Sequence, residues 1–250
     1  MKKKEKAKKI IIFFWLLGFC VCSADAAIET KDLDLTVAAP WSPVLILNGL
    51  SARAIFTYDD ASPFQLKIEF FNTSTGVPAG FIAADQLLTG ISFNLGGTLI
   101  TGGTTVIGPG SQSIAFNWVV TQLGPGDDVS GEWGYGNSVP FSTGMLSNLV
   151  SAMESHTTAM GSLNLDGPVE LAGPAGGLCT APPLIDLGGQ GAIADSIVIT
   201  LSLNSSLGGL DFIDTYGVVA EFGSDAAFLT PEPATIFLLG MGSLILFRRK

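Results

Sequence analysis

The sequence predicts an all-β fold, arranged as a two-sheet antiparallel sandwich of jelly-roll type with one short helix. Two observations predict it. Short segments alternate apolar and polar residues with the period of a half-buried strand, and glycines and prolines separate these segments. Residues 27–230 hold 28 of the 31 glycines and 11 of the 13 prolines, which punctuate the strands and are too sparse for a disordered linker.

Six segments carry the alternation. The clearest runs from Phe64 to Phe70, where every second residue is apolar and Lys67 lies on the opposite face from Ile68. The apolar positions of the others are Ala54-Phe56-Tyr58, Ile91-Phe93-Leu95, Ile114-Phe116-Trp118-Val120, Ile197-Ile199-Leu201-Leu203 and Val218-Ala220-Phe222. Six strands that each have one apolar face predict two sheets packed face to face.

One segment follows a helical period instead. Its apolar residues recur three to four positions apart and are Met145, Leu146, Leu149, Val150 and Met153. Ser142 and Thr143 precede them as potential caps, so we predict a helix at about 144–155 that covers one edge or end of the sandwich. The region 167–191 shows no clear period, and we expect a long ordered loop there.

The N-terminus has the pattern of a signal peptide. Six lysines within residues 1–9, an apolar run at 10–22 and a patch of small residues at 23–27 follow one another. The thirteen apolar residues would cover about 20 Å as a helix, less than the ~30 Å hydrocarbon core of a bilayer. Small side chains at Ala24 and Ala26 suit signal peptidase, so we expect cleavage after Ala26. An uncleaved anchor is the alternative.

The C-terminus carries a second signal. Pro231-Glu232-Pro233 precedes an apolar stretch at 234–247, and Arg248 and Arg249 follow it. Fourteen apolar residues make a helix of about 21 Å, which spans a bilayer only if the bilayer thins or flanking side chains snorkel. The basic residues should stay cytoplasmic under the positive-inside rule, which places the preceding domain outside. We predict a transmembrane helix at 234–247, with an ordinary tail anchor as the alternative.

This C-terminal arrangement resembles the PEP-CTERM sorting domain, the signal recognised by exosortase, an inner-membrane cysteine protease-transpeptidase of Gram-negative bacteria. The resemblance implies that Pro231-Glu232-Pro233 is the recognition site and that Arg248 and Arg249 complete the signal. These are substrate residues and not catalytic ones. The resemblance further implies a link to exopolysaccharide production. Segments 90–96, 131–136 and 222–224 are also similar to exosortase-dependent surface proteins, and this second similarity implies no activity.

The net charge of the domain between the two signals argues against one class of function. Residues 27–230 contain three basic and nineteen acidic residues, a net charge of −16. Nucleic-acid binding draws its affinity from Lys and Arg, so we expect none. A soluble surface protein fits this charge, and so does a protein that collects divalent cations. Cys179 is the sole cysteine beyond the signal peptide, and we expect it to be a small buried side chain.

Few residues are suited to catalysis. His156 is the only histidine, which gives little support to a Ser-His-Asp site or a zinc site. Carboxylates are abundant, and one cluster of them lies beside aromatic residues that could stack on a sugar. This candidate ligand-binding cluster is Asp127, Asp128, Glu132, Trp133 and Tyr135.

Paired acids suggest a structural calcium ion, the only cofactor that the sequence raises. The candidate oxygen ligands are Asp32 with Asp34, Asp59 with Asp60, Asp127 with Asp128, and Asp211 with Asp214. None follows the Asp-x-Asp-x-Asp-Gly loop.

We therefore expect an exported, non-enzymatic surface or extracellular-matrix protein. It comprises a signal peptide at 1–26, a β-domain at 27–230 and a sorting signal at 231–250, which anchors it in the inner membrane until exosortase acts. The alternatives are a carbohydrate-binding module and a carboxylate-dependent glycoside-processing enzyme. An exposed Trp133 and Tyr135 favour binding, two inward carboxylates about 5 to 10 Å apart favour hydrolysis, and buried aromatics leave a structural role.

Overall fold

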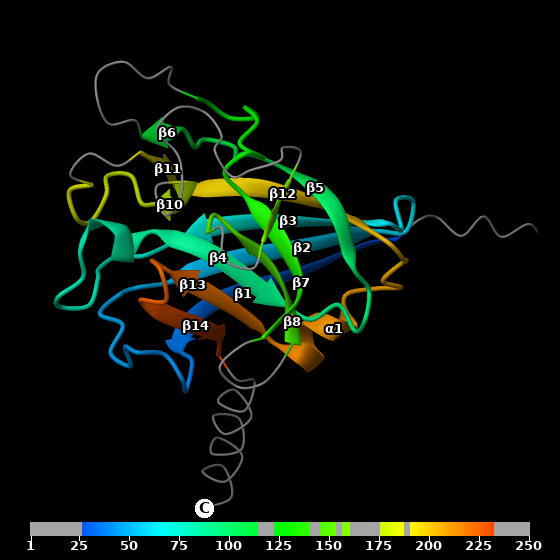
Figure 1. Ribbon diagram of the computed structural model, residues 1–250, viewed down its shortest axis with the longest axis horizontal. Helices are drawn as coiled ribbons and strands as arrows, with labels where there is room; N and C mark the ends of the chain where they lie inside the picture. The colour runs from blue at the N-terminus through cyan, green and yellow to red at the C-terminus, as the bar shows by residue number, and fades with distance from the viewer. Residues whose placement is uncertain are drawn as a thin grey trace, which may run out of the picture.

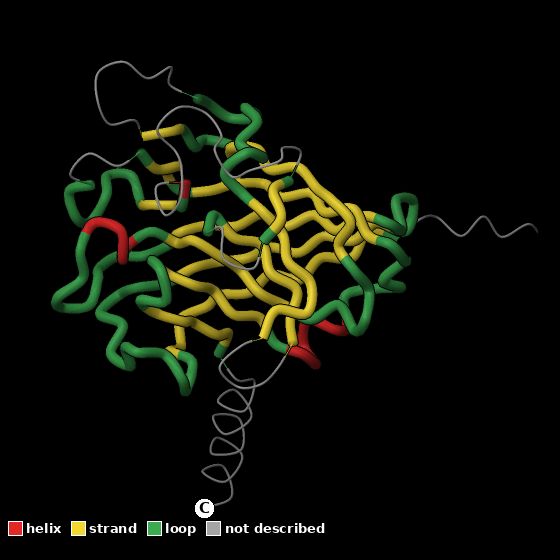
Figure 2. The backbone as a smooth tube through the Cα atoms, viewed as in Figure 1, coloured by secondary structure: helices red, strands yellow, loops and turns green. Residues whose placement is uncertain are grey.

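The computed structural model describes residues 27–114, 123–140, 146–153, 157–160, 176–187 and 191–232. Within these ranges the chain is mostly β-structure with very little helix, which confirms the predicted all-β class (Figures 1 and 2). None of the described helices is long and apolar enough to cross a membrane. The predicted signal peptide and the predicted transmembrane helix at 234–247 lie outside the described residues.

The described elements are named in chain order. The strands are β1 (Ile28–Ala38), β2 (Ala52–Asp59), β3 (Gln65–Asn72), β4 (Leu88–Phe93), β5 (Ile100–Ile107), β6 (Ser113–Ile114), β7 (Gly134–Pro140), β8 (Leu146–Ser151), β9 (Thr158–Ala159), β10 (Leu178–Cys179), β11 (Ala192–Ala194), β12 (Ser196–Leu203), β13 (Val218–Phe222) and β14 (Ala227–Pro231). The helical elements are the 3-10 helix η1 (Ala83–Gln86) and the helix α1 (Asp211–Tyr216).

All of these strands belong to one hydrogen-bonded sheet. Its main order is β5-β12-β3-β2-β1-β14-β13-β4, and β8 and then β7 continue beyond β4. Strands β10, β11 and β6 extend the sheet from the Leu88 end of β4. The predicted pair of separate jelly-roll sheets is therefore corrected to a single sheet, because β14 pairs with β1 on one side and with β13 on the other.

The sheet is so strongly curved that its two halves face each other. Figure 1 shows β4, β7 and β8 in front of β2, β3 and β12. Phe56 of β2 and Phe93 of β4 meet edge to face in the interior, with ring centroids 5.5 Å apart. One core cluster takes residues from both halves. The two layers of the predicted sandwich thus correspond to two halves of the same sheet.

The strands at the two ends of this path, β5 and β7, also approach each other. Asn137 donates from Nδ2 to the carbonyl of Ile100 at 2.8 Å and accepts the Ile100 N–H through Oδ1 at 2.9 Å. Just before β7, the N–H of Val129 donates to the carbonyl of Thr105 at 2.9 Å. The side-chain amide of Asn137 thus takes the place of a backbone hydrogen-bonded pair between β5 and β7, and the sheet nearly closes on itself.

The predicted alternation is confirmed in β2, β3, β12 and β13. Leu66 and Ile68 of β3 are fully buried, whereas Lys67 is exposed. Phe64 differs from its prediction, since the strand starts one residue later and its ring is 56 % exposed. Strand β6 covers only the start of the strand predicted around Phe116, and the remainder of that segment lies outside the described residues.

The predicted helix at about 144–155 is wrong where the structure describes it. Residues 146–151 form strand β8, which pairs with β4 along one edge and with β7 along the other. Leu149 and Val150 are consecutive and both are buried. A strand with both faces covered has apolar residues on both sides, and this run imitates a helical period. Residues 144–145 and 154–155 lie outside the described residues.

Several strands were not predicted, among them β1, β5 and β10. Only Leu35 of β1 is fully buried, because charged residues alternate along its outer face. Strand β5 contains two glycines and three threonines, so its apolar period is weak. Strand β10 lies within the predicted loop at 167–191 and has only two residues. These strands are recognisable from their pairing but not from their own apolar pattern.

Strand β3 offers a matched test of the face assignment. Ile68→Asp places an unpaired carboxylate in the core, which costs several kcal/mol against a total stability of roughly 5 to 15 kcal/mol. Lys67→Asp, one residue away, removes an exposed ion pair with Glu69 that is worth less than about 1 kcal/mol. We expect folded protein for Lys67→Asp and none for Ile68→Asp, measured by circular dichroism and thermal unfolding. Equal loss of folded protein in both variants would show that the faces are misassigned.

Candidate functional site

The predicted recognition residues follow directly on strand β14. Pro231 is the last residue of this strand and the first residue of the Pro-Glu-Pro motif, and it pairs with Leu35 of β1. Glu232 is exposed, and the hydroxyl of Thr36 donates to its Oε1 at 3.4 Å. The motif therefore begins on the folded sheet itself, without an intervening linker. Outside the described residues lie Pro233, Arg248 and Arg249.

Proline ends the strand at this point for a physical reason. Pro231 has no N–H to donate, and Pro233 removes a second donor two residues later, so the ladder cannot continue through the motif. The residues just before the motif are firmly held, since Leu229 is fully buried and pairs with β1 and β13. Strand β14 therefore extends one residue past the predicted boundary between residues 230 and 231. This strand was not predicted, because its first three residues are all buried and its sequence shows no alternation.

The candidate ligand-binding cluster is divided between the core and the surface. Trp133 is fully buried, and Tyr135 is half-buried against the same core. Glu132 is buried, whereas Asp127 and Asp128 are exposed. A sugar-stacking platform needs an exposed ring face, and Trp133 has none. The position of Trp133 fits a packing role in the interior of the sheet.

The two exposed acids of this cluster bond within their own turn. Oδ2 of Asp127 accepts the N–H of Gly124 at 2.7 Å, and Oδ1 of Asp128 accepts the N–H of Ser130 at 2.8 Å. The carbonyl of Asp127 also accepts the N–H of Ile107, in β5, at 3.0 Å. Side-chain hydrogen bonds of this kind stabilise a turn. Here the turn lies beside β5 and precedes β7.

The paired aspartates do not form a common metal site among the described residues. In this part of the chain, no group of three or more His, Cys, Asp or Glu side chains is placed to hold a metal ion. Arg53 donates from Nε and Nη2 to the two carboxylate oxygens of Asp32, and this hydrogen bonding lowers the pKa of Asp32. Oδ1 of Asp59 accepts the N–H of Ala61 at 2.8 Å. His156 and the side chain of Asp214 lie outside the described residues.

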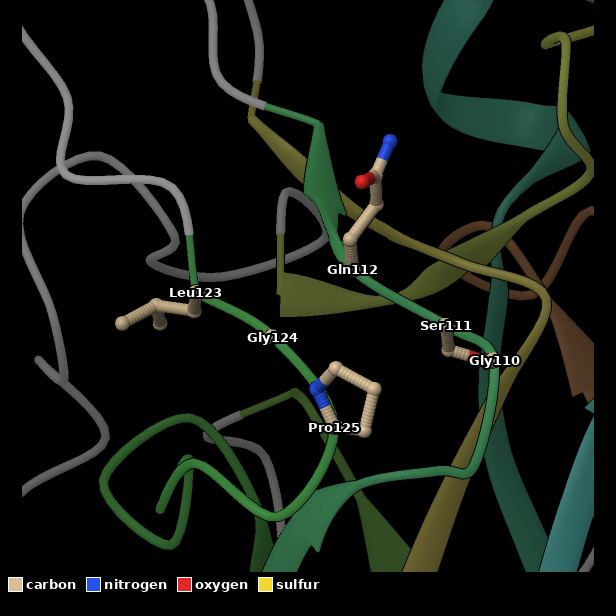
Figure 3. A pocket seen from close by; sticks show the side chains of 6 residues that line it. All are labelled: Gly110, Ser111, Gln112, Leu123, Gly124 and Pro125. Carbon is tan, nitrogen blue, oxygen red and sulfur yellow. The ribbon is translucent and has the colours of Figure 1, made fainter.

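A pocket of about 400 Å³ lies between two loops beside β6 (Figure 3). It has the size of a small-molecule site. Figure 3 shows the two loops facing each other across it, with the side chain of Gln112 extending away from Pro125. The lining residues are Gly110, Ser111, Gln112, Leu123, Gly124 and Pro125. None of them has an ionisable side chain, so the lining offers no acid, base or thiol for chemistry.

Cys179 is the small buried side chain that the sequence predicts. It is fully buried and has a free thiol. Burial, together with the charge of Asp195, raises the pKa of this thiol to about 12. The thiolate that metal binding and thiol chemistry require is therefore suppressed.

A carboxyl group that sequence reasoning missed lies on β13. Glu221 is half-buried, and its Oε1 accepts the N–H of Asp225 at 3.3 Å. Its Oε2 leans over Gly90, where a Cβ would come within 3.3 Å of it. Burial, with a smaller contribution from the charge of Asp225, raises the pKa of Glu221 to about 7, against the opposing effect of the Asp225 N–H. Only the pairing of β13 with β4 brings this group over a glycine, so no local sequence signal reveals it.

Comparison with known proteins identifies the C-terminal site. Residues 229–250 match the PEP-CTERM protein-sorting motif. Fold and motif together define an all-β protein with a C-terminal sorting signal. The chain carries a PEP-CTERM protein-sorting motif at its C-terminal end, and the matched segment starts inside strand β14. No curated protein and no solved structure matched the chain.

The raised pKa of Glu221 predicts a pH dependence of stability. The folded protein holds a proton on Glu221 between the ordinary pKa of 4.5 and the raised pKa of about 7, and the unfolded chain gives this proton up. The free energy of unfolding should therefore fall as the pH rises through this window, by up to about 3 kcal/mol from this group. Glu221→Gln removes the effect, so its unfolding temperature should exceed that of the wild type at pH 8 and match it near pH 4.5.

The control is Asp60→Asn, which removes an exposed carboxylate and reports the effect of net charge alone. Both variants and the wild type are unfolded thermally from pH 4 to pH 8. If Glu221→Gln and Asp60→Asn change the unfolding temperature equally at every pH, the fall in stability comes from general charge repulsion and not from Glu221.

Proposed function

We propose that the chain is exported through its N-terminal signal, held at the inner membrane by its C-terminal segment and then processed by exosortase at Pro231-Glu232-Pro233. The observation that carries this proposal is the match of residues 229–250 to the PEP-CTERM protein-sorting motif. The exposed carboxylate of Glu232 supports it, since a recognition residue must reach the enzyme. In this account, the final location of the β-domain is the cell surface or the extracellular matrix.

The position of β14 sets how much of the chain can be removed. A cut within the motif leaves Leu229 in the core and keeps the pairings of β14 with β1 and β13. A cut several residues earlier would remove an interior strand and divide the sheet. The released domain therefore keeps all of β14, and only residues beyond it are lost.

We further propose that the released domain has a structural or adhesive role in the exopolysaccharide-containing matrix and is not an enzyme. Its net charge of −16 favours a dispersed, hydrated state. On the outer face, Thr200 of β12 pairs with Thr104 of β5 and with Lys67 of β3. This row presents hydroxyl and ammonium groups that can hydrogen-bond to a hydrated polymer. The buried Trp133 supports a packing role over the carbohydrate-stacking and glycosidase alternatives.

The test is the intact mass of the protein released from its native host. We expect the released form to begin at Ala27 and to lack residues 234–250. Glu232→Gln should block the second cut and leave the C-terminal mass in place, because it alters the recognition site. Thr36→Val removes only the hydroxyl that contacts Glu232, so it should be processed like the wild type.

The two variants separate recognition from local structure. Blocked processing in Glu232→Gln alone supports direct recognition of the carboxylate. Blocked processing in both variants would mean that the contact with Thr36 presents the motif. A released wild-type protein that retains residues 234–250 would refute exosortase processing altogether.

A further inference from the structure

The loop between β1 and β2 carries exposed apolar side chains in an otherwise acidic domain. Leu45 is 69 % exposed and Ile46 is 74 % exposed. No charged residue occurs from position 35 to position 52. Trp41 lies half-buried at the base of this loop. Two adjacent, solvent-exposed, branched aliphatic side chains at a loop tip are unfavourable in water and indicate a partner surface.

A second uncharged loop lies beside the first. The N–H of Thr75 donates to the carbonyl of Gly49 at 2.8 Å, which joins the loop after β3 to the loop after β1. Gly49 has a φ of 93°, and a Cβ there would meet the backbone of Gly76 at 2.9 Å, so the two loops approach as closely as glycine allows. This second loop carries Ile82, which is 64 % exposed, and residues 73–84 are uncharged. We call Leu45, Ile46 and Ile82 the apolar end of the sheet.

Pro231, the last strand residue before the predicted membrane anchor, lies nearer to the apolar end than to the opposite end of β1. Pro231 pairs with Leu35, three residues from the loop end of β1 and seven residues from Ile28. At about 3.3 Å per residue, these separations are about 10 Å and about 23 Å. The three residues from Pro231 to position 234 can themselves span about 10 Å. Figure 1 shows the β1–β2 loop at the lower left, where β1 ends.

The base of the loop is fixed to the strand that leads to the anchor. The N–H of Ala39 donates to the carbonyl of Phe228 at 2.8 Å, and the N–H of Phe228 donates to Oγ of Ser42 at 3.1 Å. Phe228 lies in β14, three residues before Pro231.

We propose that the apolar end rests on the lipid bilayer that holds the C-terminal segment, with Leu45 and Ile46 inserted into the interface. The inference rests on the proposed membrane-anchored state. Lipid accepts exposed aliphatic side chains such as those of Leu45 and Ile46. Anionic headgroups repel the acidic remainder of the domain. The uncharged loops can approach the membrane surface without this repulsion. The contact would hold the Pro-Glu-Pro motif close to the membrane, where an integral membrane protease can reach it.

The experiment measures lipid contact at the loop tip in the full chain. Ile46→Cys is labelled with the environment-sensitive fluorophore NBD, and the chain is reconstituted in phosphatidylethanolamine–phosphatidylglycerol vesicles that contain nitroxide-labelled lipids. Cys20→Ala and Cys22→Ala remove the other accessible thiols, while Cys179 is buried. The matched control is Phe64→Cys, an exposed apolar residue at the other end of β2. We expect a blue shift and a loss of emission at position 46, and neither at position 64.

Each outcome is decisive once the labelled chains show the unfolding temperature of the unlabelled chain. If the chain floats with the vesicles but position 46 is not quenched, the loop contact is refuted and membrane anchoring stands. If the chain does not float, the anchoring proposal fails and takes the loop contact with it. A blue shift at position 46 that depends on protein density, without nitroxide quenching, would assign the apolar end to a protein partner. Equal quenching at both positions would indicate lipid contact without the proposed orientation.

Discussion

The structure depends on the interior position of strand β14. This strand joins β1, which belongs to one half of the curved sheet, to β13, which belongs to the other. Its Leu229 is fully buried in the core that the two halves share. Without β14, the ladder between the halves would be interrupted, and they would be held by side-chain packing, the closure near Asn137 and the hydrogen bonds from Asn72 of β3 to the carbonyls of Gln86 and Leu178. The last strand of the chain is thus the one that makes the sheet continuous.

The same strand ties the fold to the sorting signal. Residue 229 is the first residue of the matched motif and lies inside β14, and the Pro-Glu-Pro sequence starts where the ladder stops. The fold therefore fixes the position of the recognition residues relative to the sheet. In the proposed membrane-anchored state, a protease that acts there would meet a folded surface on one side and a membrane on the other. The uncharged loops at the apolar end lie where these two surfaces would come together.

The acids of the domain have local structural roles more often than shared chemical ones. Asp127 and Asp128 shape the turn that delivers β7 to the edge of β5, and Asp32 binds Arg53 across β1 and β2. Glu221 is the exception, because burial over Gly90 makes its protonation depend on folding. This arrangement disperses carboxylates around the sheet, and no described group of them is placed to hold a metal ion.

Sequence patterns predicted the fold class and the sorting signal but not the sheet topology. Alternation in β2, β3, β12 and β13 is visible in the sequence because one face of each strand is buried and the other is partly or fully exposed to solvent. In β8 both faces are covered, so Leu149 and Val150 imitated a helix. Trp133 beside Tyr135 suggested a sugar platform, since a sequence does not reveal which side of a strand faces the core. The continuity through β14 depends on partners nearly two hundred residues away, and no local pattern reveals them.

The central claim is that β14, which ends at the first residue of the Pro-Glu-Pro motif, belongs to the folded domain. Two chains test it directly, one ending after Glu232 and one ending after Ala226, each exported with the same N-terminal signal. Thermal unfolding should show a cooperative transition in the longer chain at the temperature of the full-length domain. The shorter chain should show no cooperative transition, because its sheet is interrupted between β1 and β13. Equal unfolding temperatures in the two chains would contradict the account, since β14 would then be dispensable for the fold.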